Sequence, residues 1–340
     1  MRGEFKNDMM NSNFRQAVEL INKSGRILVT THTKPDGDAI GCLVSMCSIL
    51  EARGKKVKTL LLSPAPQWYQ FLLTEKVPVL GEDVQLEDLK AGRFGKFDLI
   101  MILDTNSPGQ LPKFENYLKQ NDKPVLVIDH HLTSDGLGAV ELIESDAAAT
   151  ALVVLELLKY AGWQVTEKIA EALFVAIATD TGWFQFNNTD SRVFSASAEL
   201  VDMGVKSSEV YNKLYENFSQ QRFMLMTEML KTLELHLDGR FATMQITQPD
   251  FERTGATYAD TENLINECRR IGTVDTTALF IELDDGRIRC SLRSKGALDV
   301  GEIAVKFGGG GHKMAAGTFV PGPMENARRL ILEEISKRFS

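Results

Sequence analysis

The sequence has few cysteines, no excess of basic charge and no long apolar run. Its four cysteines show no C-x-x-C spacing, which predicts reduced, buried thiols in a cytoplasmic protein rather than disulfides or a thiolate metal site. The net charge of -8 argues against a broad nucleic-acid surface, although a local basic pocket for a short phosphorylated substrate stays open. The N-terminus has no apolar signal core, and charged residues interrupt the longest apolar segment, so we expect neither export nor a membrane span.

Length and patterning predict a two-domain α/β protein. A chain of 340 residues with 44% hydrophobic and 25% charged residues is too long for one ordinary core. Apolar strands alternate with amphipathic helices up to residue 190, one of them expected from Asp146 to Tyr160, which predicts a mostly parallel sheet. Three helices, at 191–203, 207–217 and 220–236, then predict a helical connector over 191–237. Strands at 241–247, 276–283 and 287–293 predict a smaller α/β domain over 238–340.

Histidines and aspartates gather where the predicted strands end. The chain has only five histidines, and His236 alone has an incidental setting. The apolar run 125–128 leads directly into a carboxylate and two imidazoles, and ligands bind at the carboxyl ends of parallel strands. The residues in such positions are His32 with Asp36 and Asp38, Asp104, Asp129 with His130 and His131, and Asp180 at a predicted helix C-terminus.

Each of these residues has an ordinary explanation when it is taken alone. Asp36 and Asp38 could form an Asx-turn and cap the next helix, and Asp104 could be a turn residue. Asp180 opposes the helix macrodipole unless a positive charge faces it. The joint occurrence favours a metal centre of carboxylate and imidazole ligands, which suits Mn²⁺ or Mg²⁺. Two such ions would activate water for attack on phosphorus, so the pattern predicts hydrolysis of a phosphate ester.

A glycine run marks the second domain. Gly308 to Gly311 precede His312, and four successive glycines are tolerated where the backbone turns tightly or is approached closely. We expect a phosphate site of backbone N–H groups at a helix N-terminus, with Arg293, Lys295 and His312 nearby. The alternative is a flexible hairpin or lid with solvated charges.

These motifs, in this order, resemble the DHH phosphoesterase superfamily. The resemblance rests on H-x-x-P-D-x-D-A-x-G at residues 32–41, Asp104, Asp129-His130-His131 and the Asp-Thr-Gly at 180–182. The second half resembles the DHH-associated substrate-binding domain. The whole arrangement is similar to the group of bacterial oligoribonucleases (nanoRNases) and 3'-phosphoadenosine 5'-phosphate phosphatases. Cys42 departs from the family, where serine is frequent after the glycine.

The resemblance implies a role for each site residue. Two divalent ions, Mn²⁺ or else Mg²⁺, would be bound, one by His32, Asp36 and Asp104, the other by Asp38, Asp104, His130 and Asp180. The catalytic residues would be Asp104 as the bridge, His131 facing the scissile phosphate, and Asp129 orienting a neighbouring histidine. The terminal phosphate or base of the substrate would be held across the interdomain cleft by Arg293, Lys295, Gly309, Gly310 and His312.

The implied function is hydrolysis of short oligoribonucleotides, such as pApA, to mononucleotides, and removal of a phosphate from 3'-phosphoadenosine 5'-phosphate. A RecJ-like single-strand DNA exonuclease is the nearest alternative, but no added nucleic-acid-binding module is evident. The glycine run argues against a family II inorganic pyrophosphatase. A catalytically inactive nucleotide-binding regulator is the alternative from another class. The sequence leaves the oligomeric state open, with a homodimer through helices of the first domain as one candidate.

Overall fold

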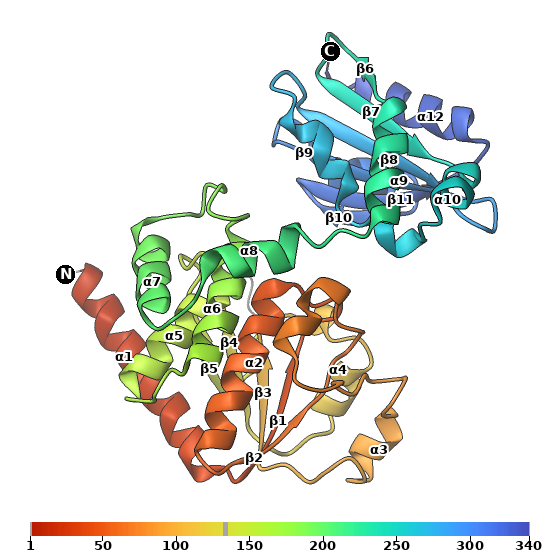
Figure 1. Cartoon of the computed structure of the whole chain (residues 1–340). Helices are drawn as coiled ribbons and strands as arrows, with labels where there is room; N and C mark the ends of the chain where they lie inside the picture. The colour runs from red at the N-terminus through yellow and green to blue at the C-terminus, as the bar shows by residue number, and fades with distance from the viewer. Residues whose placement is uncertain (1, 132–134, 340) are drawn as a thin grey trace. The chain divides into compact units, whose positions relative to one another are not determined.

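The computed structural model describes residues 2–131 and 135–339, with residues 2–11 described by their backbone alone. The chain forms two compact units, Met1–Glu216 and Asn217–Ser340 (Figure 1). Helices α7 and α8 of the expected connector fall in the first unit and α9 falls in the second. The separate connector over 191–237 stays a prediction.

The first unit is built on a five-stranded parallel sheet. Its strand order is β2-β1-β3-β4-β5. Every residue of β3 and β4 is buried, which explains why these strands read as continuous apolar runs in the sequence. The strands are β1 (Arg26–Thr31), β2 (Lys56–Thr59), β3 (Leu99–Leu103), β4 (Val125–Asp129) and β5 (Val140–Ile143).

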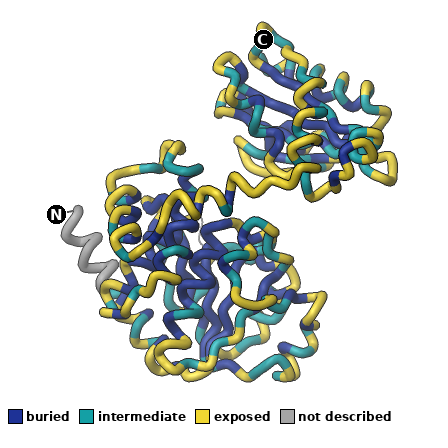
Figure 2. The backbone as a smooth tube through the Cα atoms, in the orientation of Figure 1, coloured by how far each residue is buried: buried dark blue, intermediate teal, exposed yellow. Residues whose placement is uncertain are grey.

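Helices cover both faces of this sheet. One apolar core joins Ile27 and Val29 of β1 to the larger helices, and a second core joins Leu28 to the short helices on the opposite face. Figure 2 shows the strands as the buried centre of the unit. The larger helices are α1 (Arg2–Lys23), α2 (Gly37–Ala52), α5 (Thr150–Tyr160), α6 (Glu167–Asp180), α7 (Ser191–Asp202) and α8 (Ser207–Tyr215), and the short ones are α3 (Leu86–Lys90) and α4 (Phe114–Leu118).

Helices α2 and α6 approach each other closely through a glycine. A Cβ atom at Gly41 would lie 2.3 Å from the carbonyl oxygen of Ala172 and 2.7 Å from the Cβ of Ala176. Only glycine therefore permits this packing distance. The contact joins the helix that begins beside Asp36 to the helix that ends at Asp180, so Gly41 helps to set the distance between two parts of the candidate site.

The second unit contains a six-stranded mixed sheet of order β10-β11-β9-β8-β7-β6. Among the described strand pairs, β7 and β8 run parallel and the other neighbours run antiparallel. Helices α11 and α12 pack on one face, and α9 with the 3₁₀ helix η4 on the other. The strands are β6 (Glu234–His236), β7 (Phe241–Ile246), β8 (Thr276–Glu282), β9 (Ile288–Ser294), β10 (Gly310–His312) and β11 (Ala315–Val320), and the helices are α9 (Gln220–Lys231), α10 (Gln248–Thr254), η4 (Leu264–Arg270), α11 (Val300–Lys306) and α12 (Met324–Ser336).

The predicted α/β class is confirmed, with a parallel sheet in the first unit, but two predicted helix boundaries are wrong. The helix expected from Asp146 begins only at Thr150, because residues 145–149 form turns that lead the backbone into the site. The helix expected over 220–236 ends at Lys231, because residues 234–236 pair with β7 as an edge strand. No helix in the described ranges has the length and apolar character needed to cross a membrane.

Candidate active site

The site lies at the carboxyl end of the parallel sheet, at its topological switch point. The chain runs from β1 to its neighbour β2 on one side, and then returns to β3 on the other side of β1. Crossover connections therefore leave β1 and β3 in opposite directions, and ligands bind beside such a point. His32 follows β1 directly and Asp104 follows β3, so the switch point brings an imidazole and a carboxylate together.

A first group of candidate metal ligands consists of His32, Asp36 and Asp104. The Nε2 atom of His32 lies 3.4 Å from Oδ2 of Asp104 and 3.9 Å from Oδ1 of Asp36. The Nδ1 atom of His32 lies 2.9 Å from the carbonyl oxygen of Thr33 and donates to it, which leaves Nε2 free for a metal. Asp36 is also the N-cap of α2, since it accepts from the backbone N–H of Ala39 at 3.0 Å.

A second group consists of Asp38, His130 and Asp180, which come from α2, the end of β4 and the end of α6. The Nε2 atom of His130 lies 3.5 Å from Oδ2 of Asp180 and 3.8 Å from Oδ1 of Asp104. The Nδ1 atom of His130 donates to the carbonyl oxygen of Ala147 at 3.0 Å, so the ring is oriented with Nε2 toward the carboxylates. The structure thus brings together all six residues expected to bind metal.

Asp129 holds the two histidines that follow it. Its buried Oδ1 atom accepts from the backbone N–H of His130 at 2.8 Å and from Nδ1 of His131 at 2.7 Å. The hydrogen bond from His131 to Asp129 raises the pKa of His131. Because Nδ1 is engaged, the other nitrogen of this half-exposed imidazole is the one available to a substrate.

The carboxylates of the site are buried close together and repel one another. Burial, followed by repulsion from neighbouring carboxylates, raises the pKa of Asp104 well above its ordinary value and raises that of Asp180 to about 9. Burial also raises the pKa of Asp38. A bound divalent cation would remove this repulsion, and carboxylate and imidazole donors without thiolates fit Mn²⁺ or Mg²⁺.

Thr150, which sequence reasoning missed, anchors two of the candidate ligands. Its Oγ1 donates to Oδ1 of Asp104 at 2.8 Å, and its backbone N–H donates to Oδ2 of Asp38 at 2.6 Å. The next N–H, of Ala151, donates to Oδ1 of Asp38 at 3.0 Å, so the N-terminus of α5 faces a carboxylate. No local sequence signal marks Thr150, because the N-cap of α5 is Ala149 and the partners of Thr150 lie 112 and 46 residues away in the chain.

Cys42 on α2 also reaches the site. Its buried Sγ atom donates to Oδ1 of Asp38 at 3.3 Å. Burial raises the pKa of this thiol well above its usual range, so it remains a neutral donor. The cysteine thus supplies a hydrogen bond to one of the candidate metal ligands.

Four of the eight described non-glycine residues with a positive φ are site residues or lie close to them in the chain. Asp104 has a φ of 60°, Lys34 has 54°, and Trp183 and Phe184 have 56° and 65°. Non-glycine residues rarely adopt this left-handed conformation, and they do so mainly where the surrounding structure fixes a functional geometry. The strained positions flank His32, form Asp104 itself and follow Asp180.

The second unit contains the residues expected to bind substrate. Arg293 on β9 pairs in register with Ala315 on β11, which pairs with the exposed His312 on β10. Gly309 immediately precedes β10, and Gly310 lies on it opposite Gly317. Lys295 lies beyond the end of β9, and its Nζ donates to the carbonyl oxygen of Ile271 at 3.0 Å. The helix N-terminus expected at the glycine run is wrong, because the run follows the C-terminus of α11 and leads into a strand.

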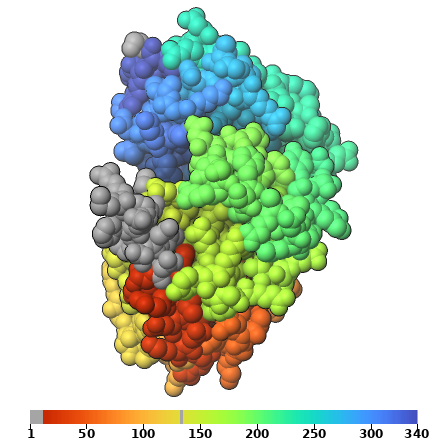
Figure 3. Space-filling model, turned by 90° about the vertical axis from the view of Figure 1, so that its left-hand side faces the viewer, coloured from red at the N-terminus to blue at the C-terminus, as the bar shows by residue number. Residues whose placement is uncertain are grey.

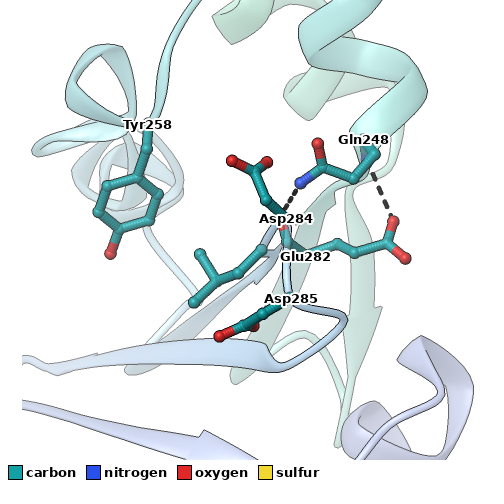
Figure 4. Close-up of a pocket in the computed structure, with 6 residues that line it drawn as sticks. Gln248, Tyr258, Glu282, Asp284 and Asp285 are labelled. Atoms are coloured by element: carbon teal, nitrogen blue, oxygen red, sulfur yellow. Dashed lines mark hydrogen bonds between the residues drawn. The ribbon is translucent and has the colours of Figure 1, made fainter.

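A hollow of ≈ 290 Å³ lies elsewhere in the second unit and is acidic. Glu282, Asp284 and Asp285 line it together with Gln248 and Tyr258 (Figure 4). Gln248 binds the backbone and the side chain of Glu282, at 2.7 and 3.1 Å. Its three carboxylates, of which Asp285 is paired with Arg287 at 2.7 Å, disfavour a phosphate, so this hollow does not suit a nucleotide.

Comparisons with known proteins agree with this arrangement. The DHH family N-terminal domain matches residues 26–177 and the DHHA1 domain matches residues 238–340. The bifunctional oligoribonuclease and PAP phosphatase NrnA of Thermus thermophilus is 30% identical over 93% of this chain and 91% of its own length. The enzyme of the same name from Bacillus subtilis is 26% identical over 90% of this chain and 92% of its own length.

A solved structure agrees in fold. An exopolyphosphatase-related protein from Bacteroides fragilis is similar with a TM-score of 0.87 and 23% identity, over 96% of both chains. The two domain matches occur in the order that the motifs predicted, and the resemblance is therefore confirmed. The chain belongs to the DHH family, with an N-terminal DHH domain and a C-terminal DHHA1 domain.

Proposed function

We propose that this protein hydrolyses short oligoribonucleotides, such as pApA, to mononucleotides and removes a phosphate from 3'-phosphoadenosine 5'-phosphate. The observation that carries the proposal is the convergence of six carboxylate and imidazole ligands at the switch point, beside the Asp129–His131 pair. The printed names of the relatives, oligoribonuclease and PAP phosphatase, support the choice of substrates.

The same proposal includes two divalent ions, with Mn²⁺ as the preferred metal. His32, Asp36 and Asp104 would hold one ion, and Asp38, His130 and Asp180 would hold the other, with Asp104 as the shared ligand. When bound, such ions supply an activated water and neutralise charge on the phosphoryl oxygens.

His131 is the proposed proton donor to the leaving oxygen. Its pKa is raised by Asp129, so the imidazole holds a proton closer to neutral pH than a free histidine does. Asp129 fixes the ring by its hydrogen bond to Nδ1, which directs the protonated Nε2 outward. Asp129 is fully buried, and it acts on the substrate only through this histidine.

Substrate binding by the second unit is also a proposal. Arg293, Lys295, Gly309, Gly310 and His312 would hold the terminal phosphate or base of the substrate. The short row from Arg293 to Ala315 and His312 across the sheet supports this role for the arginine and the histidine. Lys295 has the least support, because its Nζ binds a backbone carbonyl.

The decisive experiment measures Mn²⁺-dependent release of mononucleotide from pApA, beside a long RNA and single-stranded DNA. We expect fast cleavage of pApA, slow cleavage of the long strands, and loss of activity in His130→Ala. The matched control is His236→Ala, because His236 lies on β6 and binds Thr243 far from the ligand groups in the chain. A preference for long DNA would favour a RecJ-like exonuclease, and no turnover in any metal would favour a nucleotide-binding regulator.

We further propose that the chain forms a homodimer in the cytoplasm. The cysteines Cys42, Cys47, Cys268 and Cys290 are free, as reduced thiols would be. Phe194 and Val201 of α7 are 57% and 44% exposed, on the surface of residues 191–202 that is coloured green in Figure 3. Burying these apolar side chains against a second copy would stabilise a dimer. Light scattering tests this, and a mass near 37.8 kDa would contradict it.

A further inference from the structure

The turn that joins β5 to α5, residues 144–150, contacts the candidate site through its backbone. The carbonyl oxygen of Ala147 accepts from Nδ1 of His130 at 3.0 Å, and the backbone N–H of Thr150 donates to Oδ2 of Asp38 at 2.6 Å. Two ligands of the second group therefore depend on the position of this turn. The turn has no helix or strand structure before Thr150, so contacts with other segments must fix its backbone.

One side-chain amide joins this turn to the remaining ligand of the second group. The Nδ2 atom of Asn188 donates to the carbonyl oxygen of Ala148 at 3.1 Å and to the carbonyl oxygen of Asp180 at 3.2 Å. Ala148 lies in the turn and is buried, and Asp180 is the last residue of α6, where carbonyl groups have no intrahelical donor. An amide NH₂ group has two N–H donors, and here each donor binds one of the two segments.

The loop that carries Asn188 folds back on itself. The backbone N–H of Phe186 donates to the carbonyl oxygen of Thr181 at 3.0 Å, and the N–H of Thr189 donates to the carbonyl oxygen of Phe186 at 3.0 Å. The ring of Phe186 lies against Gly182, where a Cβ atom would be 2.3 Å from Cε1 of the ring. These contacts fix the loop, so the amide of Asn188 has a defined position relative to the end of α6.

Arg192, in the first turn of α7, attaches to the same turn at a second point. Its Nη2 atom donates to the carbonyl oxygen of Asp146, and its Nη1 atom lies 3.9 Å from Oε1 of Glu144. Its Nε atom donates to Oδ2 of Asp190, the N-cap of α7, at 2.9 Å, which orients the guanidinium group. Helix α7 packs beside α5 and α6 (Figure 1). The segment 188–192 therefore holds two carbonyl groups of the turn.

These contacts reach one of the two ligand groups more directly than the other. His32 follows β1, and Asp36 is the N-cap of α2. Within the part of the chain that the structure describes, neither residue has a hydrogen bond to Asn188 or Arg192. The first group contacts the turn through Asp104, the shared ligand, which accepts from the threonine hydroxyl at the start of α5. A change at the segment 188–192 should therefore disturb the second group first.

We propose that Asn188 is a positioning residue for the second group of candidate ligands and that it sets the affinity of this group for a divalent ion. The proposal rests on the two-ion site of the proposed function and deepens it. Ligands from separate segments bind an ion tightly only if those segments are held at fixed positions, and Asn188 hydrogen-bonds to two of them at once. Arg192 supports this role by holding the same turn. The two ions therefore bind with affinities that can be changed separately.

The test is a calorimetric titration of the metal-free full chain with Mn²⁺ in the absence of substrate. The wild type should bind two ions. Asn188→Leu, which keeps the approximate shape of the side chain and removes both donors, should weaken one binding step about 10- to 100-fold and leave the other unchanged. Asn187→Leu is the matched control, because Asn187 is the exposed neighbour in the same loop and the substitution is the same. This control should bind both ions as the wild type does.

Electron paramagnetic resonance gives a readout that a general loss of stability would not produce. At two equivalents of Mn²⁺, the wild type should show two coupled ions, because the two groups share a ligand, and Asn188→Leu should show one uncoupled bound ion. Arg192→Met, which keeps the apolar part of the side chain and removes the donors, should weaken the same step. Equal weakening of both steps in Asn188→Leu, or two unchanged steps, overturns the proposal.

The titration also separates this inference from the proposed function. If the wild type binds two ions but hydrolyses neither pApA nor 3'-phosphoadenosine 5'-phosphate, the proposed function fails. A selective loss of one ion in Asn188→Leu still supports the positioning role in that case. A wild type that binds fewer than two ions overturns the positioning role, whatever its turnover.

Discussion

Replacing Asp180 with asparagine should stabilise the metal-free protein while removing its response to metal. Asp180 is the last residue of α6, where its negative charge opposes the helix macrodipole, and its side chain is only 27% exposed. Burial and the charges of Asp38 and Asp36 raise its pKa to about 9. At neutral pH the folded metal-free protein must therefore keep this carboxyl protonated, whereas the unfolded chain ionises it.

The size of the change in unfolding free energy follows from linkage between protonation and folding. Below the ordinary pKa of 3.8 both states are protonated, and the shift has no effect. Between that value and about 9, the unfolding free energy falls by about 1.4 kcal/mol for each pH unit, because the folded state holds the additional proton. At pH 7 the penalty is at most about 4 kcal/mol, which asparagine would remove.

Thermal unfolding in the presence of a chelator measures this effect. For a unit of this size we expect Asp180→Asn to raise Tm by up to about 10 °C at pH 7 and to leave it nearly unchanged at pH 4. With Mn²⁺ the wild type should have the higher Tm, because the metal stabilises only a protein that binds it. Asp202→Asn is the matched control, since Asp202 is an exposed carboxylate at the last position of α7.

The control separates the effect of burial from the effect of the helix macrodipole. Asp202→Asn removes an unfavourable macrodipole interaction without relieving burial, so it should raise Tm by about 1–2 °C at most. The reasoning is refuted if Asp180→Asn is less stable than the wild type in chelator at pH 7, or if the difference between the two proteins does not grow as the pH rises.

Three further predictions follow from the contacts of the site. Thr150→Val, which removes the hydroxyl bound to Asp104, should weaken metal binding about 10- to 100-fold in a calorimetric titration, and Thr150→Ser should restore it. Asp129→Asn should lower kcat for pApA about 100-fold or more, with a downward shift of the pH at which His131 deprotonates, as followed by NMR. Gly41→Val should destabilise the protein by about 3 kcal/mol or more in denaturant unfolding, because its side chain would overlap α6; equal stability would contradict the close packing.

Local patterns in the sequence were sufficient to predict the parallel sheet and the candidate ligands. Strands buried on both faces must be apolar throughout, and this makes β3 and β4 visible as continuous runs. A polar residue directly after such a run lies at the edge of the sheet, where the chain leaves the core. The sequence alone therefore places Asp104, His130 and His131 at one edge of the sheet.

The contacts made between distant segments depended on tertiary structure alone. Thr150 reaches Asp38 and Asp104, which are 112 and 46 residues away in the chain. No local pattern specifies such partners, because they arise from the packing of α5 against the end of the sheet. The start of the predicted helix at Asp146 was wrong for the same reason, since propensity alone does not fix where a chain must turn toward a buried carboxylate.

In the second unit, too, the sequence indicated some residues and only the tertiary structure brought them together. The sequence indicated Arg293 and the glycine run, because both stand in unusual local patterns. Only the register of β9 with β11, and of β11 with β10, brings Arg293 and His312 to the same part of the sheet. The sequence by itself determined which groups end the strands, and the tertiary structure decided which of them face one another, because facing groups are set by packing between segments that are far apart in the chain.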